Sequence, residues 1–244
     1  MRRLRADLHI HTALSPCGAE EMTPPAIIRA ALAAGLEMIA VCDHNSAGNA
    51  GAVQAAGEGA LAVLAGIEIT TAEEAHVIGL FPDAARAMAV GRAARAALPQ
   101  RAAKATVWGE QTLMDASGRT TGHEERLLGA ATSLALADAV SLIRLHDGLA
   151  VASHVDRPSF SVPSQLGVFP EGVRFDAIEI SAVGRRQGRQ ERFASLGLPM
   201  LCSSDSHWLA EIGGGFTVME ARAADFVELA LALIGADGRR LADA

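Results

Sequence analysis

The chain has 244 residues, half of them hydrophobic, and its 21 basic and 28 acidic residues give a formal net charge of −7. This is enough for one globular domain with a substantial core, and no apolar run reaches the roughly 18 residues of a membrane span. The first residues lack the apolar stretch of a signal peptide. Three cysteines, an odd number, argue against a disulfide framework, so we expect a cytoplasmic protein.

The net charge also bears on the partners that we expect. Duplex nucleic acid is bound by a basic face, which a chain of charge −7 is not expected to offer. A few arginines would still hold a small phosphorylated substrate, a class that includes nucleotides and short oligonucleotides. We therefore expect such a substrate, and neither duplex nucleic acid nor a membrane. The sequence leaves the oligomeric state open.

The first part of the chain alternates strand and helix patterns. Short apolar runs predict strands, and apolar residues spaced three and four apart predict helices. This βαβαβ order is typical of a mainly parallel sheet. We expect strands at 4–12, 38–42, 61–67 and 74–81, and helices at 26–36, 49–56 and 83–97.

A hairpin pattern then interrupts this alternation. Residues 106–114 and 119–122 flank the turn sequence 115–118, which predicts a β-hairpin insertion at about residues 100–125. The hairpin has no catalytic signature, and we interpret it as a lid or an oligomer contact. No repeat or linker divides the chain, so we expect a single domain, 1–244. Beyond the insertion we expect helices at 132–147, 189–196 and 224–234, and strands at 149–153, 176–180, 199–203 and 216–220.

Two histidines in the first predicted strand give the first indication of chemistry. Side chains at positions i and i+2 of a strand point to the same face, so His9 and His11 project together. Paired imidazoles are typical of a metal site. Each could equally be a polar core residue with satisfied hydrogen bonds, so this pair alone leaves both interpretations open.

Similar side chains recur where later strands end. The strand ends of an α/β barrel face one mouth, where active sites form. Imidazoles bind Zn, Mn or Fe, and a carboxylate such as Glu68 or Asp205 can bridge two ions. Leaving so many buried polar groups unpaired would be costly, which favours a metal site. The candidate ligands in this pattern are His9, His11, Asp43, His44, Glu68, His76, His154, Asp205 and His207.

Cysteines and arginines add further candidates. A thiolate at Cys17, in the loop after the first strand, would be a soft metal ligand, and the alternative is a free loop cysteine. The other two cysteines lie in apolar strands and are expected in the core. Arginine forks match phosphate oxygens, so Arg157, Arg185 and Arg186 are candidate substrate-binding residues, with solvated surface positions as the alternative.

The motifs appear in a fixed order along nearly the whole chain: Asp7-Leu8-His9-Ile10-His11, Asp43-His44, Gly66-Ile67-Glu68, His76, His154 and Asp205-Ser206-His207. In this order they resemble the PHP (polymerase and histidinol phosphatase) family, and in particular its stand-alone metal-dependent phosphoesterases. The resemblance implies an α/β fold, a distorted (β/α)7 TIM-like barrel. It also implies two or three divalent ions (Zn, Mn or Fe) and hydrolysis of a phosphoester by a metal-activated hydroxide.

The resemblance also implies a role for each site residue. Glu68 bridges two metals, and Cys17 stands where many relatives supply Asp or His to a third. Asp43 binds metal weakly or orients His44. The catalytic residues would be Glu68, Asp205 and His207. The implied ligand sets are His9, His11, Glu68 and Asp205; Glu68, His76 and His154; and His44 and His207 with Cys17.

Other functions remain open at this point. Amidohydrolase-type enzymes also use His-x-His on a barrel, but many bridge their metals with a carboxylated lysine, and the only lysine, Lys104, precedes the hairpin. A catalytically silent metal-binding or regulatory module is a second alternative. Among phosphoesterases, a histidinol-phosphate-type phosphatase and a nucleotide or oligonucleotide phosphohydrolase need the same metal core, so the sequence does not separate their substrates.

Overall fold

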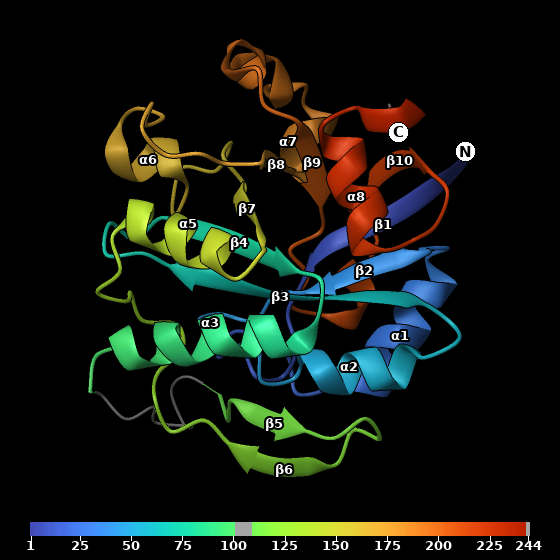
Figure 1. Cartoon of the computed structure of the whole chain (residues 1–244). Helices are drawn as coiled ribbons and strands as arrows, with labels where there is room; N and C mark the ends of the chain where they lie inside the picture. Colours follow the sequence, from blue (N-terminus) through green and yellow to red (C-terminus); the bar gives the residue numbers. More distant parts are fainter. Residues whose placement is uncertain (101–108, 243–244) are drawn as a thin grey trace.

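A curled sheet is the main element of the fold (Figure 1). The computed structural model describes residues 1–100 and 109–242. Within these residues, nine strands follow the order β11-β10-β1-β2-β3-β4-β7-β8-β9. Their bounds are β1 Arg2–Ile10, β2 Met38–Val41, β3 Ala62–Thr70, β4 His76–Phe81, β7 Leu149–Ala152, β8 Ala177–Ser181, β9 Met200–Ser203, β10 Thr217–Ala221 and β11 Arg240–Ala242.

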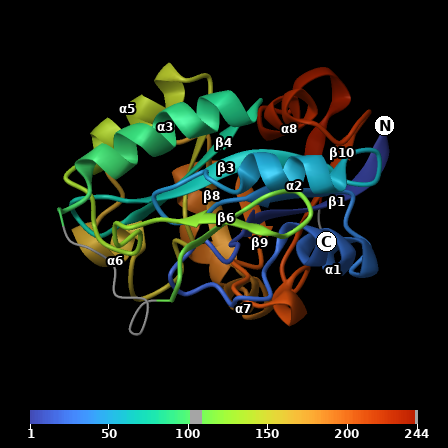
Figure 2. The ribbon, with the colours of Figure 1, turned by 90° about the horizontal axis from the view of Figure 1, so that it is seen from below.

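Helices cover the outside of this sheet. Ile27 of α1 packs with Ile39 of β2, and Val90 of α3 packs with Ile67 of β3. Seen from below, α1 and α2 lie over one half of the sheet and α3 and α5 over the other (Figure 2). No helix in the described ranges is long and apolar enough to cross a bilayer. The helices are α1 Pro24–Ala33, α2 Ala50–Gly57, α3 Ala84–Ala97, α5 Leu136–Leu145, α6 Val162–Leu166, α7 Ala182–Arg186 and α8 Phe226–Leu233, with 3-10 helices at Arg189–Leu196, Leu209–Glu211 and Ala236–Gly238.

The first strand contains an irregularity that matters for the site. The register between β1 and β2 shifts between Asp7 and Ile10. Leu8 packs in one core cluster, whereas Ile10 packs in another beside α1, although residues two apart in a regular strand share a face. A bulge of this kind re-aims side chains next to active sites. It spans His9, and His11 follows directly after the end of β1.

The curl brings the first strand close to the last strands of the chain. Beyond the end of β9, Ser206 forms an isolated parallel bridge with Ile10. The amide of His11 donates to the carbonyl of Ser206 over 2.9 Å. On the other side of the curl, His44 and Glu68 form a second isolated bridge. These bridges gather the loops after β1, β2 and β9 at one mouth.

The strand pairings confirm the expected α/β class but correct the expectation of a mainly parallel sheet. Parallel pairs join β1 to β2, β2 to β3, β7 to β8 and β8 to β9, whereas the other four pairs are antiparallel. The connection from Thr70 to His76 is too short for a parallel crossover, so β3 and β4 form a hairpin. The finer expectation, a distorted (β/α)7 barrel, is not confirmed by these pairings.

Most predicted elements appear within a few residues of their expected bounds. One helix, expected from residue 132, begins only at Leu136. Sequence analysis missed the short elements α6, α7 and β11, because three to five residues are too few for a periodic pattern. The stretch expected to form the helix 189–196 is a 3-10 helix over those residues.

The predicted hairpin is present as a separate two-stranded sheet. It consists of β5 Thr112–Met114 and β6 Thr120–His123. Asn49, next to α2, donates to the carbonyl of Thr112 and accepts from the amide of Met114, both over 2.9 Å. These bonds fix the hairpin beside the loop end of the sheet. Residues 101–108, with Lys104 and the start of the first expected hairpin strand, lie outside the described residues.

Candidate metal centre

Six imidazoles lie together at the mouth of the curled sheet. They come from the ends of β1, β2, β7 and β9 and from the start of β4. Ring centroids are 4.2 Å apart for His11 and His207 and 5.0 Å apart for His9 and His11. Protonated rings this close would repel one another, so acidic groups or cations between them would stabilise the cluster. The six are His9, His11, His44, His76, His154 and His207.

The carboxylate of Glu68 lies at the centre of this group. It is 1% exposed and sits in β3, next to β4 and the loop after β2. Its oxygens are 3.0 Å from Nδ1 of His44 and 3.0 Å from Nδ1 of His76. They also lie 3.4 Å from Nε2 of His9 and of His154. A single carboxylate thus reaches imidazoles from both sides of the mouth, as a bridging ligand must.

Unpartnered buried atoms at this centre fit a metal ion. Among the described residues, Oε1 of Glu68 and Nδ1 of His44 and His76 are buried and have no hydrogen-bond partner. Each nitrogen is 3.0 Å from a carboxylate oxygen, yet the groups are not aligned for a hydrogen bond. Buried polar groups are nearly always satisfied in proteins. Lone pairs that converge without bonding one another are the arrangement that a divalent cation completes.

Asp205 closes the other side of the centre. Its Oδ1 lies 3.0 Å from Nε2 of His11 and 3.3 Å from Nε2 of His9. Its Oδ2 accepts from Arg157 over 2.5 Å. Asp205 and His154 have φ angles of 54° and 27°, a left-handed backbone that side chains other than glycine rarely adopt. Strain of this kind is characteristic of functional sites, where the surroundings over-determine the geometry.

Among residues 1–100 and 109–242, the candidate ligand atoms form three overlapping sets, within each of which all atoms lie within 4.8 Å of one another. Glu68, His11 and His44 each belong to two sets. His154 lies next to the second set, through its contact with Glu68. The sets are His9, His11, Glu68 and Asp205; His44, Glu68 and His76; and His11, His44 and His207.

The pKa values of neighbouring groups in the cluster are shifted in opposite directions. Burial raises the pKa of Glu68, but His76 and His9 oppose it and leave the pKa well below its usual range. Burial lowers the pKa of His9, yet Glu179 and Asp205 raise it well above the usual value. Burial, with His207 and His44, holds the pKa of His11 far below it. A metal binds the unprotonated nitrogen of an imidazole, so metal binding at these histidines is coupled to proton release.

One acid of the site was missed by sequence analysis. Glu179 in β8 is 1% exposed, and its oxygens lie 3.1 and 3.2 Å from Nδ1 of His9. It also accepts from the amide of His154 over 3.0 Å. A carboxylate on one ring nitrogen fixes the tautomer and leaves the other nitrogen for a metal. The available signal was an acidic residue inside the apolar run Ala177-Ile178-Glu179-Ile180.

Asp43 does not occupy the position expected of a ligand. Its carboxylate accepts hydrogen bonds from the amide and hydroxyl of Thr12 and from the hydroxyl of Ser15, at 2.7 to 2.8 Å. Ser15 in turn lies 2.9 Å from Nδ1 of His11 and accepts from the amide of His44. Of the two roles expected for Asp43, these contacts do not fit a metal ligand and do fit a group that orients His44. Asp43 holds the loop after β1, and through Ser15 it orients two imidazoles.

Cys17 lies beside the third ligand set. Burial raises the pKa of its thiol, but the neighbouring His207 and His44 lower it further, to about 6. The same contacts raise the pKa of His207, against the effect of burial. The two other cysteines are buried, as expected. Cys17 is thus a soft donor next to His44 and His207, outside the three sets named above.

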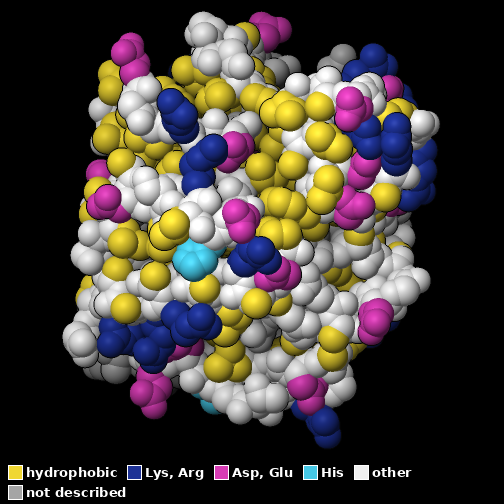
Figure 3. Space-filling model, in the orientation of Figure 1, with side chains coloured by type: hydrophobic (Ala, Val, Ile, Leu, Met, Phe, Trp, Pro, Cys, Tyr) yellow, Lys and Arg dark blue, Asp and Glu magenta, His cyan; other side chains and the backbone are white. Residues whose placement is uncertain are grey.

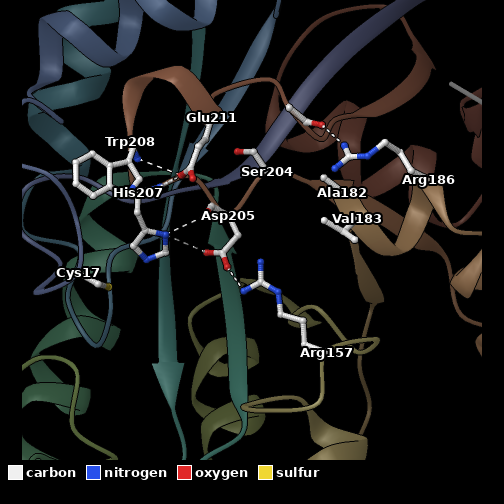
Figure 4. A pocket seen from close by; sticks show the side chains of 11 residues that line it. Cys17, Arg157, Ala182, Val183, Arg186, Ser204, Asp205, His207, Trp208 and Glu211 are labelled. Carbon is white, nitrogen blue, oxygen red and sulfur yellow. Dashed lines mark hydrogen bonds and ion pairs between the residues drawn. The ribbon is translucent and has the colours of Figure 1, made fainter.

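A cavity of about 630 Å³ opens over Asp205 and His207 (Figure 4). Arg157 points to Asp205 from below, while Arg186 lies at the far edge and donates to the carbonyl of Gly214. Trp208 is 53% exposed at the opposite rim. Arg185 lines a different cavity, with residues of α8 and β11, because neighbouring positions of the short helix α7 face different ways. The expectation that Arg185 binds substrate is corrected accordingly.

Comparisons with known proteins agree with this fold. Residues 188–234 match a family model described as PHP-associated, which confirms the resemblance to the PHP family indicated by the motifs. No curated protein matches the chain. Endonuclease Q from Pyrococcus furiosus aligns with a TM-score of 0.72 and 17% identity, over 98% of this chain and 58% of that one. The chain therefore spans little more than half the length of Endonuclease Q.

Two further structures have the same fold. A candidate metal-dependent phosphoesterase from Bifidobacterium adolescentis aligns with a TM-score of 0.58 and 18% identity, over 83% of this chain and 87% of that one. An amidohydrolase from Chromobacterium violaceum, with bound sulfate, aligns with a TM-score of 0.57 and 20% identity, over 86% and 90%. At 18% and 20% sequence identity, the similarity of these structures establishes the fold alone.

A second structure of Endonuclease Q corrects an expectation about partners. It holds a 27-mer duplex with an abasic lesion at the active site, and aligns with a TM-score of 0.69 and 17% identity over 98% of this chain and 58% of that one. The expectation that the protein binds no duplex nucleic acid, which was inferred from the net charge of −7, was therefore wrong. Net charge averages the whole surface, whereas binding depends on local groups. Basic side chains gather over α3 on one face, among apolar and acidic ones (Figure 3).

Proposed function

We propose that this protein is a metal-dependent phosphoesterase, a hydrolase of phosphoric ester bonds. The observation that carries the proposal is the position of Glu68. Its carboxylate lies in two ligand sets at once, with imidazoles on both sides and buried, unpartnered atoms that a cation would satisfy. Carboxylate-bridged ions 3.5 to 4 Å apart are the usual catalytic unit for phosphoester hydrolysis.

Two or three divalent ions would occupy this centre. The proposed ligands are the three sets together with His154 beside the second and Cys17 beside the third. Imidazole and carboxylate donors accept Zn, Mn and Fe, so availability would decide the native metal. When bound, the ions supply Lewis acidity, which makes hydroxide available at neutral pH and neutralises charge on a phosphate.

The chain's own residues would bind and orient the phosphate. Arg157 keeps one guanidinium nitrogen on Asp205, and 38% of its side chain remains exposed toward the larger cavity. A guanidinium fixed at one end presents its other donors to phosphate oxygens with little further loss of entropy. Arg186, at the edge of the same cavity, is placed to hold a more distant anionic group.

His207 is the proposed proton donor. Its Nδ1 lies 2.9 Å from the carbonyl oxygen of Asp205, which can only accept, so Nδ1 carries a proton. Nε2 is then the atom that can hold either a metal or a second proton. Nε2 can protonate a leaving oxygen only where no third ion occupies it, so this role belongs to a two-metal form of the centre, in which the contact with Cys17 raises the pKa of His207 against the effect of burial.

The substrate class that we propose is a phosphate ester of a nucleotide or of nucleic acid. The presence of duplex DNA in the similar Endonuclease Q structure supports this class. The cavity of about 630 Å³ beside the ligands has room for a nucleotide-sized group. A histidinol-phosphate-type phosphatase needs the same metal core and remains the alternative within the class of enzyme.

Hydrolysis assays test the proposal directly. Protein loaded with Mn, Zn or Fe would be offered mononucleotides, 3′,5′-bisphosphonucleosides, histidinol phosphate, a short oligonucleotide and a duplex with an abasic site. We expect phosphate or strand release from at least one ester, abolished in Glu68→Gln and retained in Glu171→Gln, an exposed loop acid. Metal binding without any turnover would instead favour a binding or regulatory module.

The amidohydrolase alternative makes a different demand on the chain. Many enzymes of that type bridge two metals with a carboxylated lysine, a position that Glu68 fills here. Hydrolysis of amides or amidines, with no turnover of phosphate esters, would support that alternative over ours.

A further inference from the structure

A second, smaller cavity opens beside His44 and His76. It has a volume of about 260 Å³, and apart from the groups of the metal centre its walls are Pro16, Leu127, Gly129 and Phe160. We call it the apolar slot. Cys17 lines both this slot and the larger cavity, so the two flank the metal centre. A phosphate at the centre would have a polar region on one side and an apolar one on the other.

Phe160 gives the slot an aromatic wall. Its ring stacks on the imidazole of His76, with centroids 4.9 Å apart and planes 21° apart. The side chain is nevertheless 45% exposed. A bulky apolar group held at the entrance of a metal centre and left partly open to solvent is a typical part of a ligand site.

The backbone of Phe160 is strained and held in place. Its φ is 57°, an outlier for a bulky residue. Its carbonyl accepts from the amide of His76 over 2.8 Å. The next residue, Ser161, donates to the carbonyl of Arg157 and caps α6 with a full capping box. Strain that the surroundings maintain in this way is evidence for a role of the side chain.

The same loop serves both cavities. Arg157 enters the larger cavity, and three residues later Phe160 enters the slot. A single segment after β7 thus holds a cation and an aromatic ring on two sides of the same metal centre. Its position would couple recognition of the phosphate to recognition of the group that the phosphate carries.

We infer that the apolar slot binds a planar aromatic group of the phosphate ester, stacked on Phe160, and so makes Phe160 a specificity-determining residue. The inference rests on the proposed phosphoesterase function. An apolar cavity of about 150 Å³ admits benzene, so the slot has room for a single ring or a nucleobase. Aromatic pairs also prefer offset stacking at centroid distances of 4.5 to 7 Å, a geometry that an exposed ring offers.

Binding of non-hydrolysable phosphonates to the Mn-loaded protein tests this inference by calorimetry. Phenylphosphonate and methylphosphonate share the same anionic head and differ in the ring. Burying a ring should give a preference for phenylphosphonate of about ten-fold or more. We expect Phe160→Ala to reduce the preference to about three-fold or less, and Phe160→Tyr to keep it. Val227→Ala, an exposed apolar position of α8 that lines neither cavity, is the matched control and should leave the preference unchanged.

The outcomes separate the inference from the function on which it rests. If methylphosphonate binds but phenylphosphonate binds no tighter, or if Phe160→Ala keeps the preference, the slot has no aromatic occupant and the inference is overturned. If neither phosphonate binds the loaded protein, the phosphoesterase proposal fails and the inference with it. Phe160→Gly, which relieves the positive φ, is a second variant to use if Phe160→Ala does not fold.

A phosphonate analogue of adenosine 5′-monophosphate identifies the source of the ring. This analogue carries its base beyond a ribose, whereas phenylphosphonate carries the ring on phosphorus. Binding of the analogue that weakens in Phe160→Ala would assign the slot to a nucleobase. A Phe160-dependent gain for phenylphosphonate alone would assign it to a ring attached directly to the phosphate.

Discussion

Glu179 should set the metal affinity of the first ligand set, although it is too far back to bind the ion. Its carboxylate contacts Nδ1 of His9 at 3.1 and 3.2 Å and accepts from the amide of His154. In Glu179→Gln the side chain keeps its size but loses its charge, and an NH₂ group replaces one of the two carboxylate oxygens. Nδ1 of His9 and the amide of His154 are both donors, so the NH₂ group cannot accept from them and at least one of the hydrogen bonds made by Glu179 is lost.

The expected size of the effect follows from the role of such partners. Removing a carboxylate that orients a metal-binding imidazole typically costs 10- to 100-fold in metal affinity or activity. This corresponds to about 1.4 to 2.7 kcal/mol. The complete burial of His9 and Glu179 favours the upper part of that range, because little solvent screens the pair.

Metal affinity would be measured by competition with a chromophoric chelator at fixed pH. Glu220→Gln in β10 is the matched control, since it replaces a partly exposed strand acid that pairs with Arg240. Circular dichroism would verify that both variants fold. If Glu179→Gln bound metal as tightly as the unmodified protein, the contact with His9 would have no positioning role, and the reasoning would be refuted.

Three further predictions concern single side chains. In metal-free protein, iodoacetamide should alkylate Cys17 with a midpoint near pH 6, since burial raises its pKa but His207 and His44 lower it further; a midpoint near 9 contradicts this. Arg157→Ala should raise KM for phosphate esters about ten-fold or more, with a smaller effect on kcat, and an unchanged KM would remove Arg157 from the substrate site. Glu228→Gln should lower Tm at pH 7, because hydrogen bonds from Arg239 and a backbone amide hold the pKa of Glu228 at about 2. That stabilisation is present above the ordinary pKa of 4.5 and is lost as pH falls toward 2, so the Tm difference should vanish over this interval, and a constant difference would refute it.

The sequence was a good guide to the metal centre, and the reasons are local. His9 lies at the end of β1 and His11 directly after it, and the remaining imidazoles lie at strand ends or, for His76, at a strand start that the fold gathers at one mouth. Glu179 escaped notice because its partner lies 170 residues away, and nothing in a single apolar strand reveals which side an acid faces. The sequence left two roles open for Asp43, because only the folded loop shows that Thr12 and Ser15 occupy its carboxylate.

The fold was predictable in its elements but less so in its pairings. Apolar runs located most strands. The direction of β4, however, depends on the five-residue connection after β3, which is too short for a parallel crossover. The order of predicted strands and helices does not by itself indicate this direction. The binding partners were the property hardest to predict from the sequence. A formal charge describes the whole surface, and it does not reveal that Arg157 and Arg186 lie together at one cavity.

Elemental analysis of protein purified without chelator, made in parallel on the unmodified chain and on Glu68→Gln, tests the central claim most directly. The account predicts two or three divalent ions per chain in the unmodified protein, and the loss of at least one ion together with all phosphoesterase activity in Glu68→Gln. Full metal content and activity in that variant, or no metal in the unmodified chain even after reconstitution, would contradict it.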